Sequence, residues 1–425
     1  MSNNEFKETE IGMIPKEWEV MKLNDFLYLN PKRSVKKGDK VKFVAMADVK
    51  EYTKNISSYI IKEFKGGSKF KNNDTLMARI TPCLENGKTA FVDFLKENEI
   101  GAGSTEFIVL SNIENVSNSN YIYYLSISNI LRDKAIKSMV GSSGRQRVQN
   151  DVLADTKIAV PPLPEQKAIA KILSDLDEKI ENNKKINENL EEVGKALFKE
   201  WFVDFEFPSG TGKPYKSSGG KMIESELGMI PKEWEIKKLK DISKIVCGKT
   251  PLKNIKENFG EDFLFIKIPD MHNNAFIIDT EDKLSKIGNE TQKGKLLPKG
   301  AINVSCIATV GLVSITSLPS HTNQQINSLI INKEEYRYFL YLKLKYMKRK
   351  LEDMGSGGSA TLNVNTSSFS NIEIILPNNV LLKQYHNIIE PVFNEIEQNV
   401  KEIQSLQQTR DALLSKLMKG EVRVK

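Results

Sequence analysis

The sequence has little cysteine and histidine and no long apolar run. Its three cysteines, Cys83, Cys247 and Cys306, lie far apart, and its three histidines are equally scattered. A disulfide framework or a zinc site needs clustered ligands, so we expect neither. No run of about 18 or more apolar residues is present, which argues against a transmembrane helix. Residues 1–10 are polar and lack the apolar segment of a signal peptide, so a cytoplasmic protein is expected.

Motifs typical of enzymes are also scarce. The chain has no glycine-rich phosphate loop ending in Lys-Ser or Lys-Thr, no His-Glu-x-x-His and no Asn-Pro-Pro-aromatic sequence. One loose match remains, because Asp270, Glu281 and Lys283 fit the Pro-Asp…Glu-x-Lys pattern of nucleases that use Mg²⁺. The first half of the chain has no counterpart of this pattern, and 28% of all residues are charged. A surface loop is therefore the favoured interpretation.

What the chain does have is a basic excess that is unevenly distributed. The net charge is +7; residues 164–205 carry −3 and residues 379–425 carry +1, which leaves +9 on the rest. A basic excess favours a polyanionic partner such as nucleic acid. A lysine-rich solvated surface explains the charge alone equally well.

The strongest signal is an internal duplication. Residues 8–20 recur as residues 224–236, and eight consecutive positions, Gly-Met-Ile-Pro-Lys-Glu-Trp-Glu, are identical. The same offset of 216 relates apolar positions further on, among them Val148 with Val364, Leu153 with Phe369 and Ile158 with Ile374. In between, residues 25–140 and 241–356 share almost no sequence. We name these stretches variable region 1 and variable region 2. Halves that are alike at their edges and different inside predict one frame carrying two specificities.

Two long amphipathic helices are predicted, one at the end of each half. The seam of the first, spaced near 3,4 over about 40 residues, comprises Ile172, Leu176, Ile180, Asn183, Leu190 and Leu197. The seam of the second comprises Val392, Ile396, Asn399, Ile403, Leu406 and Leu413. Helices of this length need a helical partner to bury the seam, and the two asparagines either fix its register or lie at its wet edge. Pro391 predicts a kink or a new helix start within the second helix.

Short apolar runs between Gly, Asn and Pro clusters predict strands inside both variable regions. Each region also has a helical stretch, at residues 121–139 and 336–354. The fold class is therefore α+β, with two similar mixed α/β domains separated by two long helices. The expected parts are domain 1 at 1–160, a central helix at 161–206, a linker at 207–222, domain 2 at 223–377 and a C-terminal helix at 378–425.

Polar loops supply candidate nucleic-acid contacts. Arginine pairs with guanine edges and Asn or Gln with adenine edges, while Ser, Thr and Lys reach phosphates. The candidates in the first half are Arg79, Thr81, Lys88, Ser104, Thr105, Arg145 and Arg147. Those in the second half are Thr309, Asn323, Gln324, Gln325, Ser359, Thr361 and Asn363. Each residue alone fits ordinary turn chemistry better. As a set, in a basic duplicated chain, they favour DNA contact.

The whole chain resembles the specificity subunits of type I restriction-modification enzymes. The resemblance is carried by Gly-Met-Ile-Pro-Lys-Glu-Trp-Glu at the start of both halves, by Pro161-Pro162-Leu163-Pro164-Glu165-Gln166, and by the two long helices. Residues 77–82, 103–107 and 322–326 also look like parts of the target-recognition domains of that family. At the second junction, Leu376-Pro377-Asn378-Asn379 replaces the double-proline motif.

This resemblance implies two target-recognition domains, each reading one half of an asymmetric, bipartite site in double-stranded DNA. The helices would pack as an antiparallel coiled coil, set the spacer between the half-sites and dock two modification subunits through their seams. Restriction subunits would join through the complex. The chain itself would carry no catalytic site, metal or cofactor, and S-adenosylmethionine, ATP and Mg would belong to the partner subunits. The alternatives are the metal-dependent nuclease and a coiled-coil adaptor without a nucleic-acid role, which has no need of the basic charge outside the helices.

Overall fold

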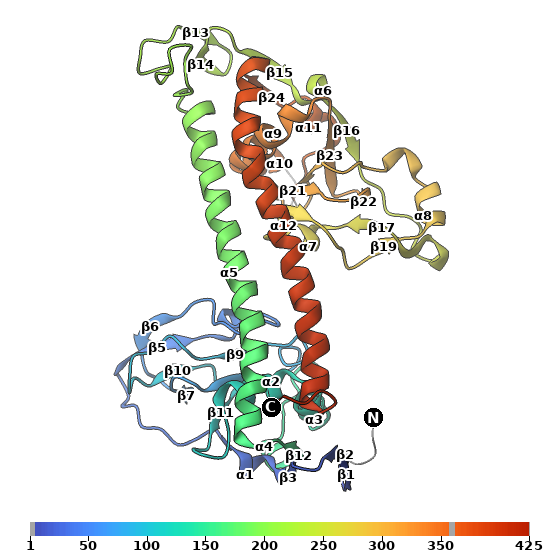
Figure 1. The fold of residues 1–425 in the computed structure, drawn as a ribbon. Helices are drawn as coiled ribbons and strands as arrows, with labels where there is room; N and C mark the ends of the chain where they lie inside the picture. Colours follow the sequence, from blue (N-terminus) through green and yellow to red (C-terminus); the bar gives the residue numbers. More distant parts are fainter. Residues whose placement is uncertain (1–4, 357–361, 425) are drawn as a thin grey trace. The chain divides into compact units, whose positions relative to one another are not determined.

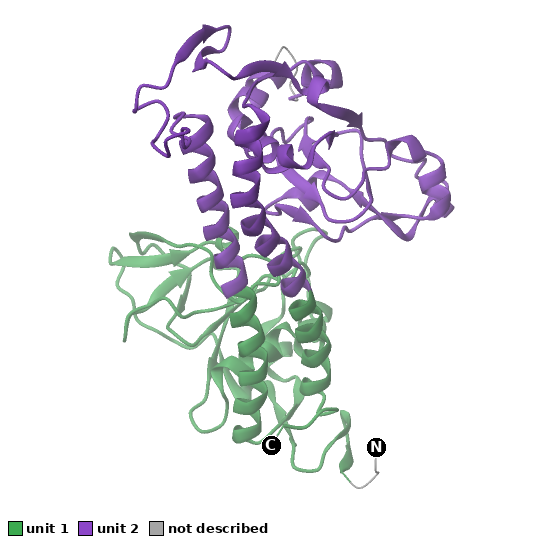
Figure 2. Ribbon diagram, turned by 45° about the horizontal axis from the view of Figure 1, so that its top comes forward, with its two compact units in different colours: residues 1–181, 405–425 green, residues 182–404 purple. Residues whose placement is uncertain are grey.

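The computed structural model describes residues 5–356 and 362–424. The chain divides into two compact units (Figure 2). Unit 1 comprises residues 1–181 and 405–425, and unit 2 comprises residues 182–404. The two predicted helices are α5 (Leu163–Phe202) and α12 (Asn379–Met418), each 40 residues long (Figure 1). Each unit therefore contains one variable region and a stretch of both helices.

Helices α5 and α12 pack antiparallel. In unit 2, the Asn183 side-chain amide donates to a Glu402 carboxylate oxygen at 2.7 Å, and the Asn399 side-chain amide donates to the Asn187 side-chain oxygen Oδ1 at 2.9 Å. Rising numbers on α5 thus meet falling numbers on α12. The expected fold class of two mixed domains with two long packed helices is confirmed. Asn183 is only 1% exposed and Asn399 6%, so both lie inside the seam and not at its wet edge.

The predicted seam residues are buried to different degrees. Ile180 and Ile396 are buried, with 2% and 1% of their surface exposed. The half-buried members are Ile172, Leu176, Leu190, Leu197, Val392, Ile403, Leu406 and Leu413. The seam is therefore only partly covered within each unit.

Pro391 does not start a new helix, because α12 continues through it without a break. That part of the prediction is wrong. Proline removes one backbone donor, which leaves the carbonyl of residue 387 without its helical partner. Pro391 and Asn387 both lie on the exposed side of α12, so solvent can satisfy this carbonyl.

The duplicated sequence forms the same frame in both units. A hairpin precedes the buried tryptophans, Trp18 and Trp234, which are 0% and 4% exposed. A two-stranded antiparallel ladder then closes each variable region at its two ends. The hairpins are β1 (Phe6–Thr9) with β2 (Gly12–Pro15), and β13 (Met222–Ser225) with β14 (Gly228–Pro231). The ladders are β3 (Glu19–Lys22) with β12 (Lys157–Val160), and β15 (Glu235–Lys238) with β24 (Glu373–Leu376).

The variable regions share a topology although their sequences do not match. The larger sheet has the strand order β4-β11-β8-β9 in unit 1 and β16-β23-β20-β21-β18 in unit 2, and the first four strands are antiparallel in both. The strands of unit 1 are β4 (Leu27–Leu29), β8 (Thr75–Ala78), β9 (Thr89–Phe91) and β11 (Phe107–Asn112). Those of unit 2 are β16 (Ser243–Cys247), β18 (Phe276–Ile277), β20 (Ile302–Ser305), β21 (Val313–Thr316) and β23 (Ile326–Ile331). The duplication therefore extends through the variable regions.

A smaller sheet repeats this correspondence. Its order is β6-β5-β10-β7 in unit 1 and β19-β17-β22 in unit 2, and each sheet contains one parallel pair, β5 with β10 or β17 with β22. In unit 1 the strands are β5 (Lys40–Val44), β6 (Ile60–Glu63), β7 (Ser68–Phe70) and β10 (Gly101–Gly103). In unit 2 they are β17 (Phe259–Ile266), β19 (Lys283–Leu284) and β22 (Ser320–Thr322).

Each predicted helical stretch of the variable regions is two helices. Residues 121–139 fall on α2 (Ser119–Ile127) and α3 (Asn129–Lys137), and residues 336–354 on α9 (Arg337–Tyr346) and α10 (Lys348–Gly355). Ser128 ends α2, since its backbone is extended and its hydroxyl donates to the Leu125 carbonyl at 2.7 Å. The short helices are α1 (Leu23–Phe26), α4 (Asn150–Ala154), α6 (Leu239–Ile242), α7 (Ile268–Met271), α8 (Lys286–Glu290) and α11 (Thr366–Ser370). In the described part of the chain, none of the helices is long and apolar enough to cross a membrane.

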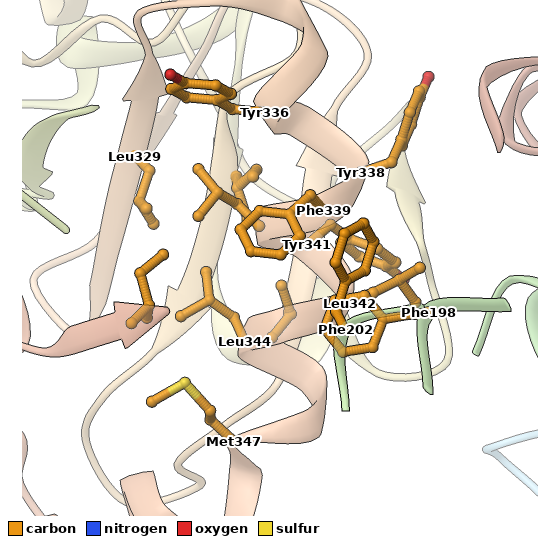
Figure 3. Packing of buried hydrophobic residues seen from close by; sticks show 14 of the residues in the cluster. Phe198, Phe202, Leu329, Tyr336, Tyr338, Phe339, Tyr341, Leu342, Leu344 and Met347 are labelled. Atoms are coloured by element: carbon orange, nitrogen blue, oxygen red, sulfur yellow. The ribbon is translucent and has the colours of Figure 1, made fainter. Parts of the chain in front are cut away.

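An aromatic core fixes α5 to the variable region of unit 2. The rings of Phe198 and Phe202 lie 6.0 and 4.9 Å from that of Phe339 on α9 (Figure 3). Phe207, at the start of the expected linker, stacks on Trp234 with ring centroids 5.2 Å apart. Each such aromatic pair contributes about 0.5–1.5 kcal/mol beyond the area it buries. The beginning of the linker is therefore part of the core of unit 2.

Candidate nucleic-acid interface

Three loops of unit 1 meet at one end of its larger sheet. The backbone amide of Arg79 donates to the carbonyl of Glu106 at 2.9 Å, and that of Thr81 donates to the carbonyl of Gln146 at 3.0 Å. The amide of Val148 donates to the carbonyl of Arg79 at 2.9 Å. We name this place edge 1; it consists of residues 79–81, 104–106 and 145–148.

Unit 2 contains the three equivalent backbone hydrogen bonds. The backbone amide of Cys306 donates to the carbonyl of Gln325 at 2.8 Å, and that of Ala308 to the carbonyl of Leu362 at 3.0 Å. The amide of Val364 donates to the carbonyl of Cys306 at 2.8 Å. The corresponding place is edge 2; it consists of residues 306–309, 323–325 and 362–364. Each half of the duplicated frame thus supports the same three loops.

Edge 1 carries a charged pair. The Arg147 guanidinium donates through Nη2 and Nε to the Glu106 carboxylate at 2.8 and 3.0 Å, and the two side chains are 44% and 25% exposed. These hydrogen bonds lower the pKa of Glu106. A bidentate pair is held in one geometry. The remaining arginine donors can form hydrogen bonds with a guanine edge, and the remaining carboxylate lone pairs can accept one from a cytosine amino group.

The other candidates of the first half divide into supporting and exposed residues. Arg79 donates through Nη2 to the Val148 carbonyl at 3.2 Å, and the Thr81 hydroxyl donates to the Glu85 carboxylate at 2.7 Å. Both side chains therefore hold the loops in place. Ser104 accepts a bond from the backbone amide of Glu106, while Thr105 and Arg145 are exposed on edge 1. Lys88 lies apart from this group, since its ammonium donates to the Met46 carbonyl at 3.1 Å.

Edge 2 is uncharged and rich in amides. The Asn323 amide donates to the Gln325 side-chain carbonyl at 3.1 Å, and the Thr250 hydroxyl donates to that of Gln324 at 2.6 Å. Gln324, Thr309 and Asn363 are exposed. Ser359 and Thr361, also predicted to contact DNA, lie outside the described residues. Edge 2 thus presents amide and hydroxyl groups where edge 1 presents an arginine and a carboxylate.

Thr250 was missed by the analysis of the sequence. The available signal is Gly248, directly after β16: a Cβ there would lie 2.2 Å from the carbonyl oxygen of Asn323. Only glycine allows the loop after β16 to approach edge 2 this closely. A glycine followed by Lys249 and Thr250 at the end of a strand could therefore have indicated a further contact loop.

The nuclease pattern of variable region 2 serves local structure. The Asp270 carboxylate accepts bonds from the backbone amides of Lys267 at 2.7 Å and Glu281 at 3.3 Å. The Lys283 ammonium pairs with Glu261 and Asp279 at 2.9 and 3.1 Å. Among residues 5–356 and 362–424, no three or more His, Cys, Asp or Glu side chains are placed to hold a metal ion together. The geometry therefore favours a folded loop over a Mg²⁺ centre.

A buried polar junction joins variable region 1 to both helices within unit 1. The Asp177 carboxylate of α5 accepts bonds from Arg410 of α12 at 2.8 Å and from the Tyr124 hydroxyl at 2.7 Å. One turn away, the Lys54 ammonium donates to the Ser174 hydroxyl at 3.0 Å. Burial lowers the pKa of Lys54. These hydrogen bonds hold variable region 1 against the stretches of α5 and α12 that belong to the same unit.

Comparison with known proteins explains the duplication. A family model described as the type I restriction modification DNA specificity domain matches the chain twice, at residues 15–192 and 231–408. The chain belongs to this family. Its two matched segments are offset by the 216 residues that relate the two halves of the sequence. The specificity-subunit resemblance is thus confirmed, with one family domain in each half.

Relatives align with this specificity subunit over most of their length. The HindI specificity subunit of Haemophilus influenzae is 37% identical, over 85% of this chain and 90% of that protein. The MjaIX specificity subunit of Methanocaldococcus jannaschii is 29% identical, over 99% and 97%. The crystal structure of a type I restriction-modification S subunit from M. genitalium shares 16% identity, covers 98% of this chain and 97% of its own, and has a TM-score of 0.59. That structure shows the same fold.

A buried histidine makes the stability of the specificity subunit depend on pH. His321 in β22 is fully buried beside edge 2, and burial lowers the pKa of its imidazole to about 4. The imidazole of an unfolded chain titrates near 6.5, so the unfolded chain takes up a proton that the folded chain excludes. Stability is therefore full above about pH 6.5 and falls as the pH is lowered towards about 4, by about 2 kcal/mol at about pH 5.

Urea denaturation near pH 7 and near pH 5 measures this effect. We expect the wild-type chain to lose about 2 kcal/mol more than His321→Gln over this interval, since glutamine does not titrate. Equal losses in the two proteins would mean that His321 is not responsible.

Proposed function

We propose that this specificity subunit recognises a bipartite, asymmetric site in double-stranded DNA, with edge 1 contacting one half-site and edge 2 the other. The observation that carries the proposal is the repetition of three backbone hydrogen bonds between loops whose side chains differ. A common frame keeps the position of the loops, while the side chains on them are free to change. That is the arrangement expected of two readers of different sequences.

The chemistry of the edges supports different half-sites. Edge 1 offers Arg147 and Glu106, which suit guanine acceptors and the cytosine amino group. Edge 2 offers Gln324 and Asn363, which suit the paired donor and acceptor of adenine. We therefore expect edge 1 to favour G·C pairs and edge 2 to favour A·T pairs among the positions that each reads.

The helices are proposed to set the spacer between the half-sites and to dock two modification subunits. Ile186 and Val193 of α5 lie seven residues apart on one helix face and are 44% and 55% exposed; Ile388 of α12 is 50% exposed. Exposed apolar side chains on a long helix favour contact with another protein. Restriction subunits would join through this complex. S-adenosylmethionine, ATP and Mg would be bound by the partner subunits, and this chain would have no catalytic role.

Selection from a pool of random duplexes tests the proposal. The chain is incubated with its modification subunit, bound duplexes are recovered and sequenced, and the modification subunit alone serves as the control. We expect two different short half-sites at one fixed separation. Binding without any enriched sequence would contradict the proposal and favour the coiled-coil adaptor.

A further inference from the structure

One segment of variable region 1 is much more basic than the corresponding segment of variable region 2. Residues 30–74, between β4 and β8, have a net charge of +7, whereas residues 248–301, between β16 and β20, have a net charge of +1. The exposed lysines of the first segment are Lys32, Lys36, Lys37, Lys40, Lys50, Lys62, Lys65 and Lys71. Over the whole of variable regions 1 and 2, residues 25–140 and 241–356, the net charges are +5 and +4, so variable region 1 differs in gathering its charge in this one segment.

Within the described part of the chain, Lys62 and Lys65 are unpaired, unlike two lysines of the corresponding segment of unit 2. In unit 2, Lys267 pairs with Asp282 at 2.7 Å, and Lys283 pairs with Glu261 at 2.9 Å. In unit 1, Lys62 and Lys65 form no ion pair with any described residue. The charges of Lys62 and Lys65 are thus not neutralised by an ion pair with these residues, whereas those of Lys267 and Lys283 are.

Lys62 and Lys65 line a hollow of about 570 Å³ on the smaller sheet of unit 1. The remaining lining residues are Phe43, Glu63, Gly66, Gly67 and Thr105. Since Thr105 belongs to edge 1, the hollow borders that edge directly. The lining contains two lysines and one carboxylate, that of Glu63, so it keeps a positive charge.

The shape of the hollow depends on two glycines. Gly66 and Gly67 have φ angles of 143° and 121°, which side chains rarely adopt. A Cβ on Gly67 would lie 2.1 Å from the carbonyl oxygen of Gly103. Bare backbone therefore lines one side of the hollow. On the other side the Lys62 ammonium lies 3.3 Å from the ring centroid of Phe43, which holds the charge in place.

We propose that this hollow binds a backbone phosphate of DNA next to the half-site read by edge 1, and that Lys62 and Lys65 thereby contribute to the chain's salt-dependent affinity. The inference rests on the proposed function. Lysine is a compact point charge that suits phosphate and carries little base information. Glycine backbone allows a phosphate to approach closely.

The double variant Lys62→Gln/Lys65→Gln tests the site. Kd is measured over a series of salt concentrations for the complex with the modification subunit, using a duplex that contains the selected motif and a duplex of mixed sequence. We expect binding to both duplexes to weaken roughly tenfold at low salt, and the slope of log K against log salt to fall by about two. The bases chosen from a random pool stay unchanged.

The matched control is Lys213→Gln/Lys216→Gln, which removes two equally exposed charges from residues 207–222. It is expected to change neither affinity nor slope. An equal loss of affinity in the control would show that the loss comes from the total charge of the chain and not from the hollow, and would overturn the proposed site. Unchanged affinity in Lys62→Gln/Lys65→Gln, or altered base preference, would overturn it as well. The proposed function is tested separately by the motif that the wild-type chain selects. The salt dependence of binding to mixed-sequence DNA does not depend on that motif.

Discussion

Arg410→Ala is expected to lower the free energy of unfolding by about 3–5 kcal/mol. The Asp177 and Arg410 side chains are only 10% and 11% exposed, and they form an ion pair at 2.8 Å. Removal of the guanidinium leaves the Asp177 carboxylate buried, with a hydrogen bond from the Tyr124 hydroxyl of the variable region. Breaking one side of a buried pair is costly because the other charge stays desolvated. Urea denaturation of the two proteins at one pH gives the difference.

Unit 2 indicates a control for this prediction. The offset of 216 maps Asp177 to Phe393 and Arg410 to Gly194, and a Cβ on Gly194 would lie 3.5 Å from the Phe393 ring. The frame therefore accepts a large and a small apolar partner at this position. We expect Asp177→Phe/Arg410→Gly to lose much less stability than Arg410→Ala alone. A loss of less than about 1 kcal/mol for Arg410→Ala, as for an exposed pair, would show that the junction is not a buried one.

The long helices could be predicted well from the sequence because their causes are local. The seam of α5 repeats over the whole helix, and no proline interrupts it between Pro164 and Pro208. The continuity of α12 could not be predicted in the same way. Whether Pro391 breaks a helix depends on whether solvent reaches the carbonyl of residue 387, and this is set by tertiary packing.

The candidate site was predicted as a set of residues but not as an arrangement. Arg79, Thr81 and Arg147 were named from their types, while their meeting depends on strand pairing over up to 69 positions. Glu106 was not named as a contact, and its role follows only from its bond with Arg147. Sequence reports which groups are available, and the register of β8 and β11 decides which of them come together.

The common topology of the variable regions was hidden by two effects. Buried positions in a sheet accept any apolar side chain of suitable size, so sequence identity disappears while the strand remains. Loops of different length also change the offset, from 216 at the frame to 227 between the ends of β8 and β20 and 219 between the starts of β11 and β23. A search at one fixed offset therefore finds the frame and misses the strands.

Exchange of one variable region is expected to exchange one half-site. In the variant, residues 239–372 replace residues 23–156, and Asp177→Phe and Arg410→Gly supply the helix contacts that variable region 2 has in its own unit. The junctions are equivalent: the Leu23 amide donates to the Thr156 carbonyl at 2.8 Å, and the Leu239 amide donates to the Ile372 carbonyl at 3.0 Å. Each lost base pair of the first half-site should cost about 1–3 kcal/mol of discrimination.

The most direct test of the account is to sequence the duplexes that the wild-type chain and this exchange variant select from one random pool, each with the modification subunit. The account predicts two different half-sites for the wild-type chain and two copies of the edge 2 half-site for the variant. Circular dichroism and binding of the modification subunit establish that the variant is folded. Retention of the wild-type motif by a folded variant would contradict this prediction, because the bases of the first half-site would then be read outside the exchanged residues.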